Sequence, residues 1–205
     1  MGVNEVVGKL FRDRLLEGAA TKIPGRCCAV MARALGSGCA SERADGRRRA
    51  AMPTIGLIAD THGLVRPGVF VAFDGVDQIL HAGDVGDGVL DELRTIAPVT
   101  AVFGNTDAPH DPALVACVDR EFEGVRLHVS HGHELGSPLP EQLLAAYDAD
   151  VIVYGHTHRQ LVVQSGKRWV VNPGAAGARR FSLPASVARL TIVRGQIQVE
   201  LVDLG

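Results

Sequence analysis

The sequence contains no apolar run that approaches the roughly 18 residues expected of a membrane-spanning helix. It holds only 4 cysteines among 205 residues, and their spacing does not match a zinc knuckle. We therefore predict free thiols in a reducing compartment, and a cytoplasmic location. Internal repeats and low-complexity tracts are also absent from the sequence. What remains is an ordinary globular composition, with 46% hydrophobic and 21% charged residues.

The net charge is small, at -2, but it is unevenly distributed. Residues 1–51 carry 10 basic and 5 acidic residues, whereas the remainder carries 11 and 18. The excess of acidic residues after residue 51 argues against a nucleic-acid-binding surface. The basic residues that could favour one form two short runs, at 47–49 and 179–180. We expect neither a nucleic-acid partner nor a membrane partner, and a homo-oligomer stays open.

The segment before residue 52 differs from the rest of the chain. Apolar residues recur at helical spacing over residues 3–15, and clusters of Gly, Ala and Ser follow. Residues 27–35 are apolar but interrupted by an arginine, and no convincing cleavage site follows, so we expect no secretory signal. We predict a flexible extension over residues 1–51, and one domain over residues 52–205 with Met52 as a candidate initiator.

From residue 54 the sequence alternates strand, loop and helix. Short apolar runs bounded by turn residues predict strands over residues 55–59, 78–82, 99–103, 125–130 and 151–154. Helical spacing predicts helices over 88–96 and 140–147, the second starting at a proline. Strands alone are predicted after that, over 160–164, 169–172, 187–193 and 197–201. The pattern indicates an α/β (α+β) fold of two packed sheets flanked by helices.

Residues that can bind metal follow each of the first five predicted strands. The clusters are Asp60-Thr61-His62, Gly83-Asp84, Gly104-Asn105-Thr106-Asp107, His131-Gly132-His133 and Gly155-His156-Thr157-His158. Any one of them could be an ordinary turn or a capping residue. Five in succession at strand ends, where α/β sheets place their sites, favour a metal centre.

The donor types narrow the choice of metal. Carboxylate, imidazole and amide groups together suit Mn²⁺, Fe²⁺, Co²⁺, Ni²⁺ or Zn²⁺. No cysteine joins the set, which disfavours a structural zinc site. A carboxylate that bridges two ions about 3.5–4 Å apart provides a clamp for in-line phosphoryl displacement. A water between two such ions loses a proton near neutral pH and can attack phosphorus.

Six motifs together resemble the signature of the calcineurin-like metallophosphoesterase superfamily. They are Ile-Ala-Asp-Thr-His-Gly at 58–63, His-Ala-Gly-Asp-Val at 81–85, Gly-Asn-Thr-Asp at 104–107, His-Gly-His at 131–133, Gly-His-Thr-His at 155–158 and Asn-Pro-Gly at 172–174. The resemblance covers residues 53 to about 201, and the short inserts are similar to the small bacterial and archaeal phosphodiesterases of the YfcE type. It implies the metallo-dependent phosphatase fold, a four-layer αββα sandwich with metals at its mouth.

By position, the resemblance implies a ligand set for two divalent ions, with Mn²⁺ the favoured metal. Asp60, His62 and His158 would hold the first ion, Asn105, His131 and His156 the second, and Asp84 would bridge them. The implied activity is hydrolysis of small-molecule phosphodiesters by a metal-bridged hydroxide, with monoesters open as a second substrate class.

One position departs from the family pattern. Many larger members have a histidine after the asparagine as an acid for the leaving group, and this chain has Thr106 there. Asp107, His133 or a metal-bound water could supply the proton instead, although His133 also fits a structural place beside the ligands. His81 lies inside its strand, and we expect it to be packed there without binding metal.

A second function class stays open. A subunit of the retromer coat looks similar to this family, and there the fold serves as a non-catalytic protein-interaction scaffold. A scaffold is free to lose metal ligands, whereas all seven ligand positions of this sequence carry competent side chains. The intact ligand set favours an enzyme.

Overall fold

A computed structural model describes residues 53–108, 110–178 and 183–205. The predictions for residues 1–51, for Met52 and for residues 179–180 lie outside this part of the chain. The strands are β1 (Thr54–Ile58), β2 (Gln78–His81), β3 (Val99–Val102), β4 (Leu114–Val115), β5 (Val118–Phe122), β6 (Val125–Val129), β7 (Val151–Val153), β8 (Leu161–Ser165), β9 (Arg168–Asn172), β10 (Ser186–Val193) and β11 (Gln196–Asp203). The helices are α2 (Pro67–Ala72), α3 (Val89–Arg94), the 3₁₀ turn η1 (His133–Leu135) and α4 (Pro140–Ala146).

The strands form two mixed sheets. The first has the order β11-β10-β1-β2-β3-β4, and the second has the order β5-β6-β7-β9-β8. Strands β1 to β4 run parallel, whereas β10 and β11 pair antiparallel on the other side of β1. In the second sheet β6, β7 and β9 are parallel, and the edge strands β5 and β8 are antiparallel. Each sheet therefore has a parallel centre whose strands end at a common edge.

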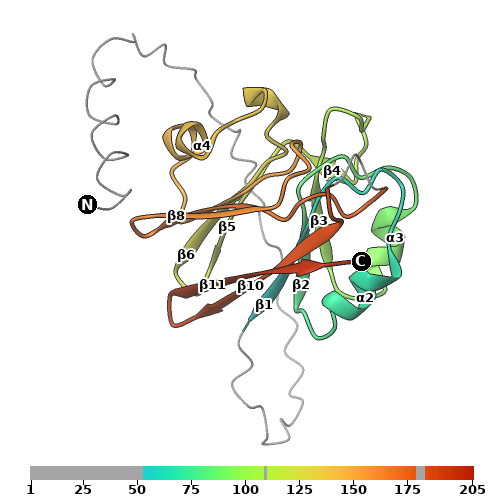
Figure 1. Ribbon diagram of the computed structural model, residues 1–205, viewed down its shortest axis with the longest axis horizontal. Coiled ribbons are helices and arrows are strands. Elements are labelled where there is room, and N and C mark those ends of the chain that lie inside the picture. The colour runs from blue at the N-terminus through green and yellow to red at the C-terminus, as the bar shows by residue number, and fades with distance from the viewer. Residues whose placement is uncertain (1–52, 109, 179–182) are drawn as a thin grey trace, which may run out of the picture. The chain divides into compact units, whose positions relative to one another are not determined.

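Three buried apolar clusters separate four layers (Figure 1). The largest lies between the sheets and takes Leu57 and Leu80 from one and Leu127 and Val153 from the other. A second cluster packs α2 and α3 against the first sheet, and a third packs α4 against the second. The predicted αββα sandwich is confirmed.

Local sequence explains where the helices begin. Proline occupies the first turn of both α2 and α4, where its missing N–H costs no helical hydrogen bond. The α4 start also has Gln142, whose side-chain oxygen accepts a hydrogen bond of 2.8 Å from the backbone N–H of Leu139. Helix α3 begins after Gly88, which has φ of 77°, a conformation that glycine adopts without strain.

The structure adds elements that the sequence analysis missed. Helix α2 and strands β4 and β5 were not predicted, so the third and fourth clusters are not on consecutive strands. Strand β5 has the sequence VDREF with three exposed charged residues, and it forms by pairing with β6. Cys117 is disulfide-bonded, so the prediction of a free thiol is wrong for this residue. The other three cysteines lie outside the described residues.

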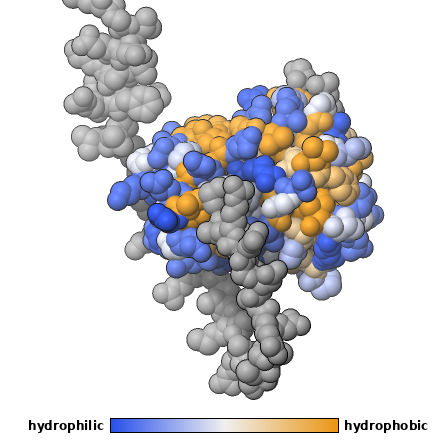
Figure 2. Space-filling model, turned by 90° about the horizontal axis from the view of Figure 1, so that it is seen from below, coloured by the Kyte–Doolittle hydropathy of each residue, from blue (hydrophilic) through white to orange (hydrophobic). Residues whose placement is uncertain are grey.

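Helices of the described segments are all too short or too polar to cross a membrane. Figure 2 shows one side of the surface, where hydrophobic residues form patches between hydrophilic ones. The large apolar side chains that are exposed in the described part are Leu64, Phe70, Val71, Val115, Leu139 and Leu201. None of these six belongs to the predicted ligand set.

Candidate metal centre

The predicted ligands come from both sheets. Asp60, Asp84 and Asn105 follow the carboxyl ends of the adjacent parallel strands β1, β2 and β3. His131 and His156 follow β6 and β7 in the second sheet, and His158 belongs to the same loop as His156. Because parallel strands end at a common edge, each sheet delivers its donors to one place, and the packed sheets bring the two sets together.

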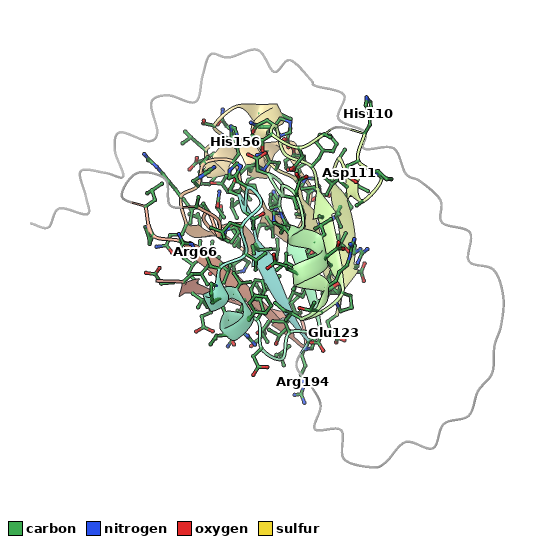
Figure 3. All side chains as sticks on the ribbon, turned by 90° about the vertical axis from the view of Figure 1, so that its right-hand side faces the viewer. Arg66, His110, Asp111, Glu123, His156 and Arg194 are labelled. Carbon is green, nitrogen blue, oxygen red and sulfur yellow. The ribbon has the colours of Figure 1, made fainter. Side chains whose placement is uncertain are left out.

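An unusual backbone marks these positions. Among the described residues, seven that are not glycine have φ in the left-handed region, and five of them are predicted ligands: Asp60 (54°), His62 (47°), Asp84 (53°), His156 (65°) and His158 (57°). The other two, Glu123 and Arg194, precede glycines in hairpin turns and lie at the opposite end of the molecule from His156 (Figure 3). Strained backbone of this kind persists where surrounding structure enforces it, and it gathers at functional sites.

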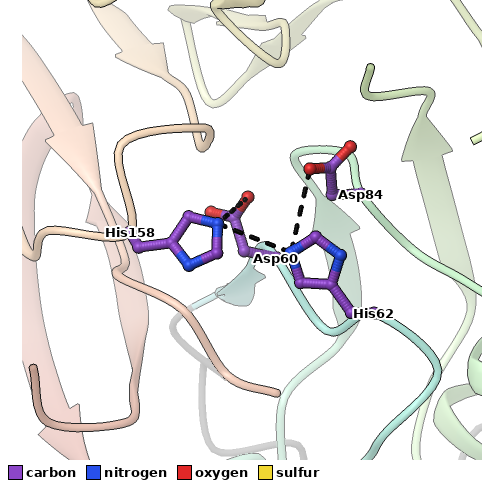
Figure 4. Close-up of side chains that lie close together, drawn as sticks. All are labelled: Asp60, His62, Asp84 and His158. Carbon is purple, nitrogen blue, oxygen red and sulfur yellow. Dashed lines mark hydrogen bonds and ion pairs between the residues drawn. The ribbon is translucent and has the colours of Figure 1, made fainter. Parts of the chain in front are cut away.

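Four predicted ligands form a compact cluster (Figure 4). Asp60, His62, Asp84 and His158 each offer one ligand atom, and these atoms all lie within 4.8 Å of one another. The Nε2 atom of His62 lies 3.4 Å from that of His158 and 3.8 Å from Oδ2 of Asp84. The Nε2 atom of His158 lies 3.4 Å from Oδ1 of Asp60. Two imidazoles and two carboxylates therefore point at one small volume.

The remaining predicted ligands meet at Asn105. Its Oδ1 atom lies 3.2 Å from Nε2 of His131 and 2.9 Å from Nδ1 of His156. Oδ1 of Asp84 is 3.5 Å from Nε2 of His131, so the two oxygens of Asp84 face the two groups of ligands. Asp84 therefore lies between the two groups.

Hydrogen bonds orient the His131 ring for a cation. The Nδ1–H group donates to the carbonyl oxygen of Ala82 at 2.7 Å, so Nε2 is the nitrogen that faces Asn105 and Asp84. Burial opposes protonation of His131, but the hydrogen bonds to Asp84 and Ala82 outweigh it and raise the pKa of His131. A position that stabilises a proton between Nε2 and these oxygens also suits a divalent cation.

Asp84 stays ionised in this setting. Burial disfavours the carboxylate, but hydrogen bonds from His131 and from the Thr106 backbone N–H, 2.9 Å away, hold the pKa of Asp84 well below its usual range. Gly104 permits this approach, because a Cβ atom there would lie 2.1 Å from Oδ1 of Asp84. His156 is held neutral, since burial and then the charge of His131 lower its pKa.

A buried pair connects two of the ligand loops. The Thr61 hydroxyl donates to the carbonyl oxygen of Val85 at 2.7 Å and accepts from Nε2–H of His81 at 2.9 Å. Burial lowers the pKa of His81 to about 3, so the ring is neutral. The prediction that His81 is packed inside its strand is confirmed, and the pair ties the Asp60–His62 loop to the loop after Asp84.

Asp107 does not have the surroundings of a proton donor. Its carboxylate accepts hydrogen bonds from the backbone N–H groups of Val85, Gly86 and Gly104, at distances of 2.8 to 3.1 Å. Both oxygens are used to hold the loops after β2 and β3 together. The prediction that Asp107 supplies a proton to the leaving group is therefore not supported by its contacts, which assign it a structural role.

His133 lies beside the ligands. Its ring centroid is 5.2 Å from that of His131 and 6.3 Å from that of His156. Its Nδ1 atom lies 3.7 Å from Oε2 of Glu134, a residue that the sequence analysis did not single out. His133 thus lies beside the rings of His131 and His156 and outside the compact cluster. The signal for Glu134 in the sequence is only its position next to the His-Gly-His motif.

The arrangement defines a class of protein: an αββα sandwich with a carboxylate–imidazole centre at the seam of its two sheets. The donor set fits divalent metal ions, because the cluster combines two imidazoles with two carboxylates, one of them held ionised, and the neighbouring His131 ring is oriented by its hydrogen bond to Ala82. The sequence profile of the calcineurin-like phosphoesterase superfamily domain matches residues 54–195. The chain belongs to this superfamily.

Named relatives support the assignment. The chain is 33% identical over 160 residues to a probable metallophosphoesterase from Methanothermobacter thermautotrophicus, covering 74% of this chain and 92% of that protein. It is 36% identical over 109 residues to the phosphodiesterase YfcE of Escherichia coli, covering 50% of this chain and 58% of the relative. The resemblance to the superfamily and to YfcE-type proteins is thereby confirmed.

Solved structures share the fold. A crystal structure of a single mutant of Vps29 from Entamoeba histolytica superposes with a TM-score of 0.61 at 23% identity, covering 73% of this chain and 98% of the other. Wild-type Vps29 from the same organism, solved in complex with Zn²⁺, gives 0.59 at 26% identity, with 74% and 99% covered. These two similarities show that Vps29 and this chain share the αββα fold.

Proposed function

We propose that this protein is a metal-dependent phosphodiesterase that acts through two divalent ions. Asp60, His62 and His158 would hold the first ion, Asn105, His131 and His156 would hold the second, and Asp84 would bridge them. Two such ions supply Lewis-acid stabilisation of the charge on phosphorus oxygens and lower the pKa of a water nucleophile. Mn²⁺ is the preferred metal of the proposal, and Zn²⁺, Fe²⁺, Co²⁺ and Ni²⁺ also suit these donors.

The protein's own groups perform the positioning. Asp84 stays anionic between the two ligand groups because His131 and the Thr106 N–H group donate to it. Asn105 contributes a neutral oxygen between two imidazoles, and its exposed location leaves that side open to a substrate. His133 is the remaining side chain near the centre that can hold or give a proton to a departing oxygen. Thr106 occupies the position after Asn105 where many larger family members have a histidine acid, so we expect a preference for diesters with good leaving groups.

The single observation that carries the proposal is the placement of Asp84 between two groups of donors. Its Oδ2 faces His62 at 3.8 Å and its Oδ1 faces His131 at 3.5 Å. A one-ion site would need only one of these contacts. A bridging carboxylate needs both.

The test is metal analysis combined with a phosphoester panel on the purified protein. Two transition-metal ions per chain are expected, and chelation should abolish hydrolysis of bis(p-nitrophenyl) phosphate, with recovery on adding Mn²⁺. Monoesters belong in the same panel, because they stay open as a second substrate class. Full activity in protein shown to be metal-free would refute the proposal.

A protein-interaction scaffold is the competing function, favoured by the similarity in fold to Vps29. The two functions differ in what the ligands are for. A scaffold predicts no turnover above background with any metal in the panel, even when two ions bind. The enzyme predicts turnover that falls with each ligand removed.

A further inference from the structure

The loop between β6 and η1 carries His131 and His133 with only a glycine between them. Gly132 has φ of 96° and is buried, so it supplies a sharp turn but no side chain that could fix it. The His131 ring is oriented by Ala82, as described above. The backbone carbonyl groups of this turn have partners, because the Gly155 N–H donates to the His131 oxygen at 3.1 Å and the Leu135 N–H donates to the Gly132 oxygen at 3.1 Å. The Gly132 N–H group still needs a contact from a side chain.

Glu134 makes that contact. Its Oε2 atom accepts the Gly132 N–H group at 2.9 Å, and its Oε1 atom accepts the Tyr147 hydroxyl at 2.7 Å. Both carboxylate oxygens are thus engaged, one on the ligand loop and one at the end of α4. Although the Glu134 side chain is 38% exposed, it spans these two elements in a fixed orientation.

Tyr147 is itself firmly held. Its ring stacks on His128 with centroids 3.8 Å apart and an interplanar angle of 20°. The His128 Nδ1 atom lies 2.7 Å from Oδ1 of Asp119, and the Tyr147 carbonyl oxygen accepts a hydrogen bond from Arg168. A rigid partner gives Glu134 a fixed place from which to hold Gly132.

We propose that Glu134 is a positioning residue for the second ion. It touches none of the predicted ligands, and it acts by fixing Gly132 so that His131 keeps its Nε2 atom directed at Asp84 and Asn105. This inference rests on the proposed two-metal function. Tyr147 supports Glu134 in the same role through its hydroxyl group.

The first experiment is a titration of metal-free protein with Mn²⁺, followed by calorimetry. Glu134→Ala should weaken the binding of one of the two ions by about 10–100-fold, the usual cost of losing a residue that orients a ligand. Glu134→Gln should restore most of the affinity, because its amide oxygen can still accept the Gly132 N–H. Tyr147→Phe should give a smaller loss. Glu141→Ala, an exposed glutamate of α4, is the matched control and should leave both ions unchanged.

Combining Glu134→Ala with Asn105→Ala distinguishes a local effect on the second ion from a general loss of folding. Asn105→Ala removes a ligand of the second ion, so one tight ion should remain. Adding Glu134→Ala should then leave the affinity of that remaining ion unchanged. A further loss in this background would show that Glu134 supports the fold as a whole, and it would overturn the proposal, as would unchanged affinities in Glu134→Ala alone.

Amide hydrogen exchange at Gly132 tests the positioning role in the absence of metal. In metal-free protein, Glu134→Ala should speed exchange of this N–H by about tenfold or more, as expected for a lost hydrogen bond to a charged acceptor, while Glu134→Gln stays near wild type. Unchanged exchange in Glu134→Ala would overturn the inference. If the wild type bound fewer than two ions, the two-metal function would fail, and the exchange result would still decide whether Glu134 holds the loop.

Discussion

In the half of the centre built from Asp60, His62 and His158, a fully buried carboxylate lies among imidazoles, and all three residues have left-handed backbone. In the half built from Asn105, His131 and His156, every donor is neutral in its metal-binding form, and only His156 has left-handed backbone. Charge attracts a cation more strongly than a dipole does, and a strained, buried cluster is already organised before the ion arrives. We therefore expect the first ion to bind tightly and the second to exchange more readily.

The largest effect should come from the one residue that both halves share. Asp84→Asn removes the charge that we propose bridges the two ions, and it should lower the rate of diester hydrolysis by at least about a hundredfold, together with the metal content. The measurement is kcat/KM with elemental analysis of the same sample. Near-normal metal content and turnover would remove Asp84 from the bridge and with it the comparison between halves.

Making the first half neutral should erase the difference. Asp60→Asn replaces the buried carboxylate with an amide, as at Asn105, and should weaken the tighter ion by about 10–100-fold, so that the two affinities approach each other. Titration with Mn²⁺ measures both. Asp74→Asn, an exposed carboxylate of a turn, is the control and should change neither affinity. If the weaker ion were the one affected, the assignment of the two halves would be reversed.

Acid should lower the stability of the protein because His81, which is buried next to the Asp60–His62 loop, stays neutral in the folded state. The pKa of buried His81 is lowered from 6.5 to about 3, so between these values the unfolded chain binds a proton that the folded chain does not. Above about pH 6.5 both states of the chain have a neutral His81, and this residue does not lower the free energy of unfolding. As the pH falls from 6.5 towards 3, the free energy of unfolding decreases, and the loss amounts to about 2–3 kcal/mol at pH 4.5. His81→Leu should flatten this dependence.

Urea unfolding of metal-free wild type and His81→Leu at pH 7.0 and 4.5 measures the difference. Histidines common to both proteins cancel in the comparison. An equal loss of stability in both proteins on acidification would show that the acid sensitivity arises elsewhere.

A smaller effect, on the preference for leaving groups, is expected at Thr106, the position that departs from the family pattern. Thr106→His places an imidazole after Asn105 and should narrow the gap between aryl and alkyl diesters by about tenfold, below the 10²–10⁴-fold of a well-placed general acid. The measurement is kcat/KM across leaving groups of increasing pKa. A wild-type rate that does not depend on leaving-group pKa, with chemistry limiting, would mean that His133 or another group already supplies the proton.

The smallest effect is expected from the segment that neither half uses. Every predicted ligand lies after residue 52, and the family profile begins at residue 54. A chain that starts at Met52 should fold and retain the activity of the full chain, measured side by side under the same conditions. The truncated chain keeps Cys117 as its sole cysteine, so both proteins are compared under reducing conditions. An insoluble or inactive truncated protein would show that residues 1–51 contribute to the domain.

The sequence predicted the parts of this structure that repeat a simple pattern. Apolar runs such as Ile55–Ala59 are buried strands whichever partner they meet, so the predicted and observed ends differ by about one residue. Strand β5 was missed because its exposed Asp119, Arg120 and Glu121 follow no hydrophobic pattern, and its pairing with β6 decides its conformation. Helix α2 was missed because six residues are too few to show a period.

The candidate centre was predictable in its donors but not in their support. Clusters at strand ends give the donors, because parallel strands end together. Three backbone N–H groups donate to the Asp107 carboxylate only because the loops after β2 and β3 lie close together. No local sequence pattern indicates that proximity. The left-handed backbone at Asp60 and His158 is equally invisible in the sequence, since glycine is the residue that such conformations normally indicate.

The candidate centre takes residues from both sheets, so its geometry depends on how the two sheets pack against each other. The His131 ring, carried by the second sheet, donates to Ala82 of the first, and the Asp60 and His158 side chains meet from opposite sheets. A slide of one sheet over the other by a fraction of an ångström would change these distances before it opened the apolar layer between them. Metal affinity would then report distant packing changes, and core substitutions such as Leu127→Ala should register there as well as in stability.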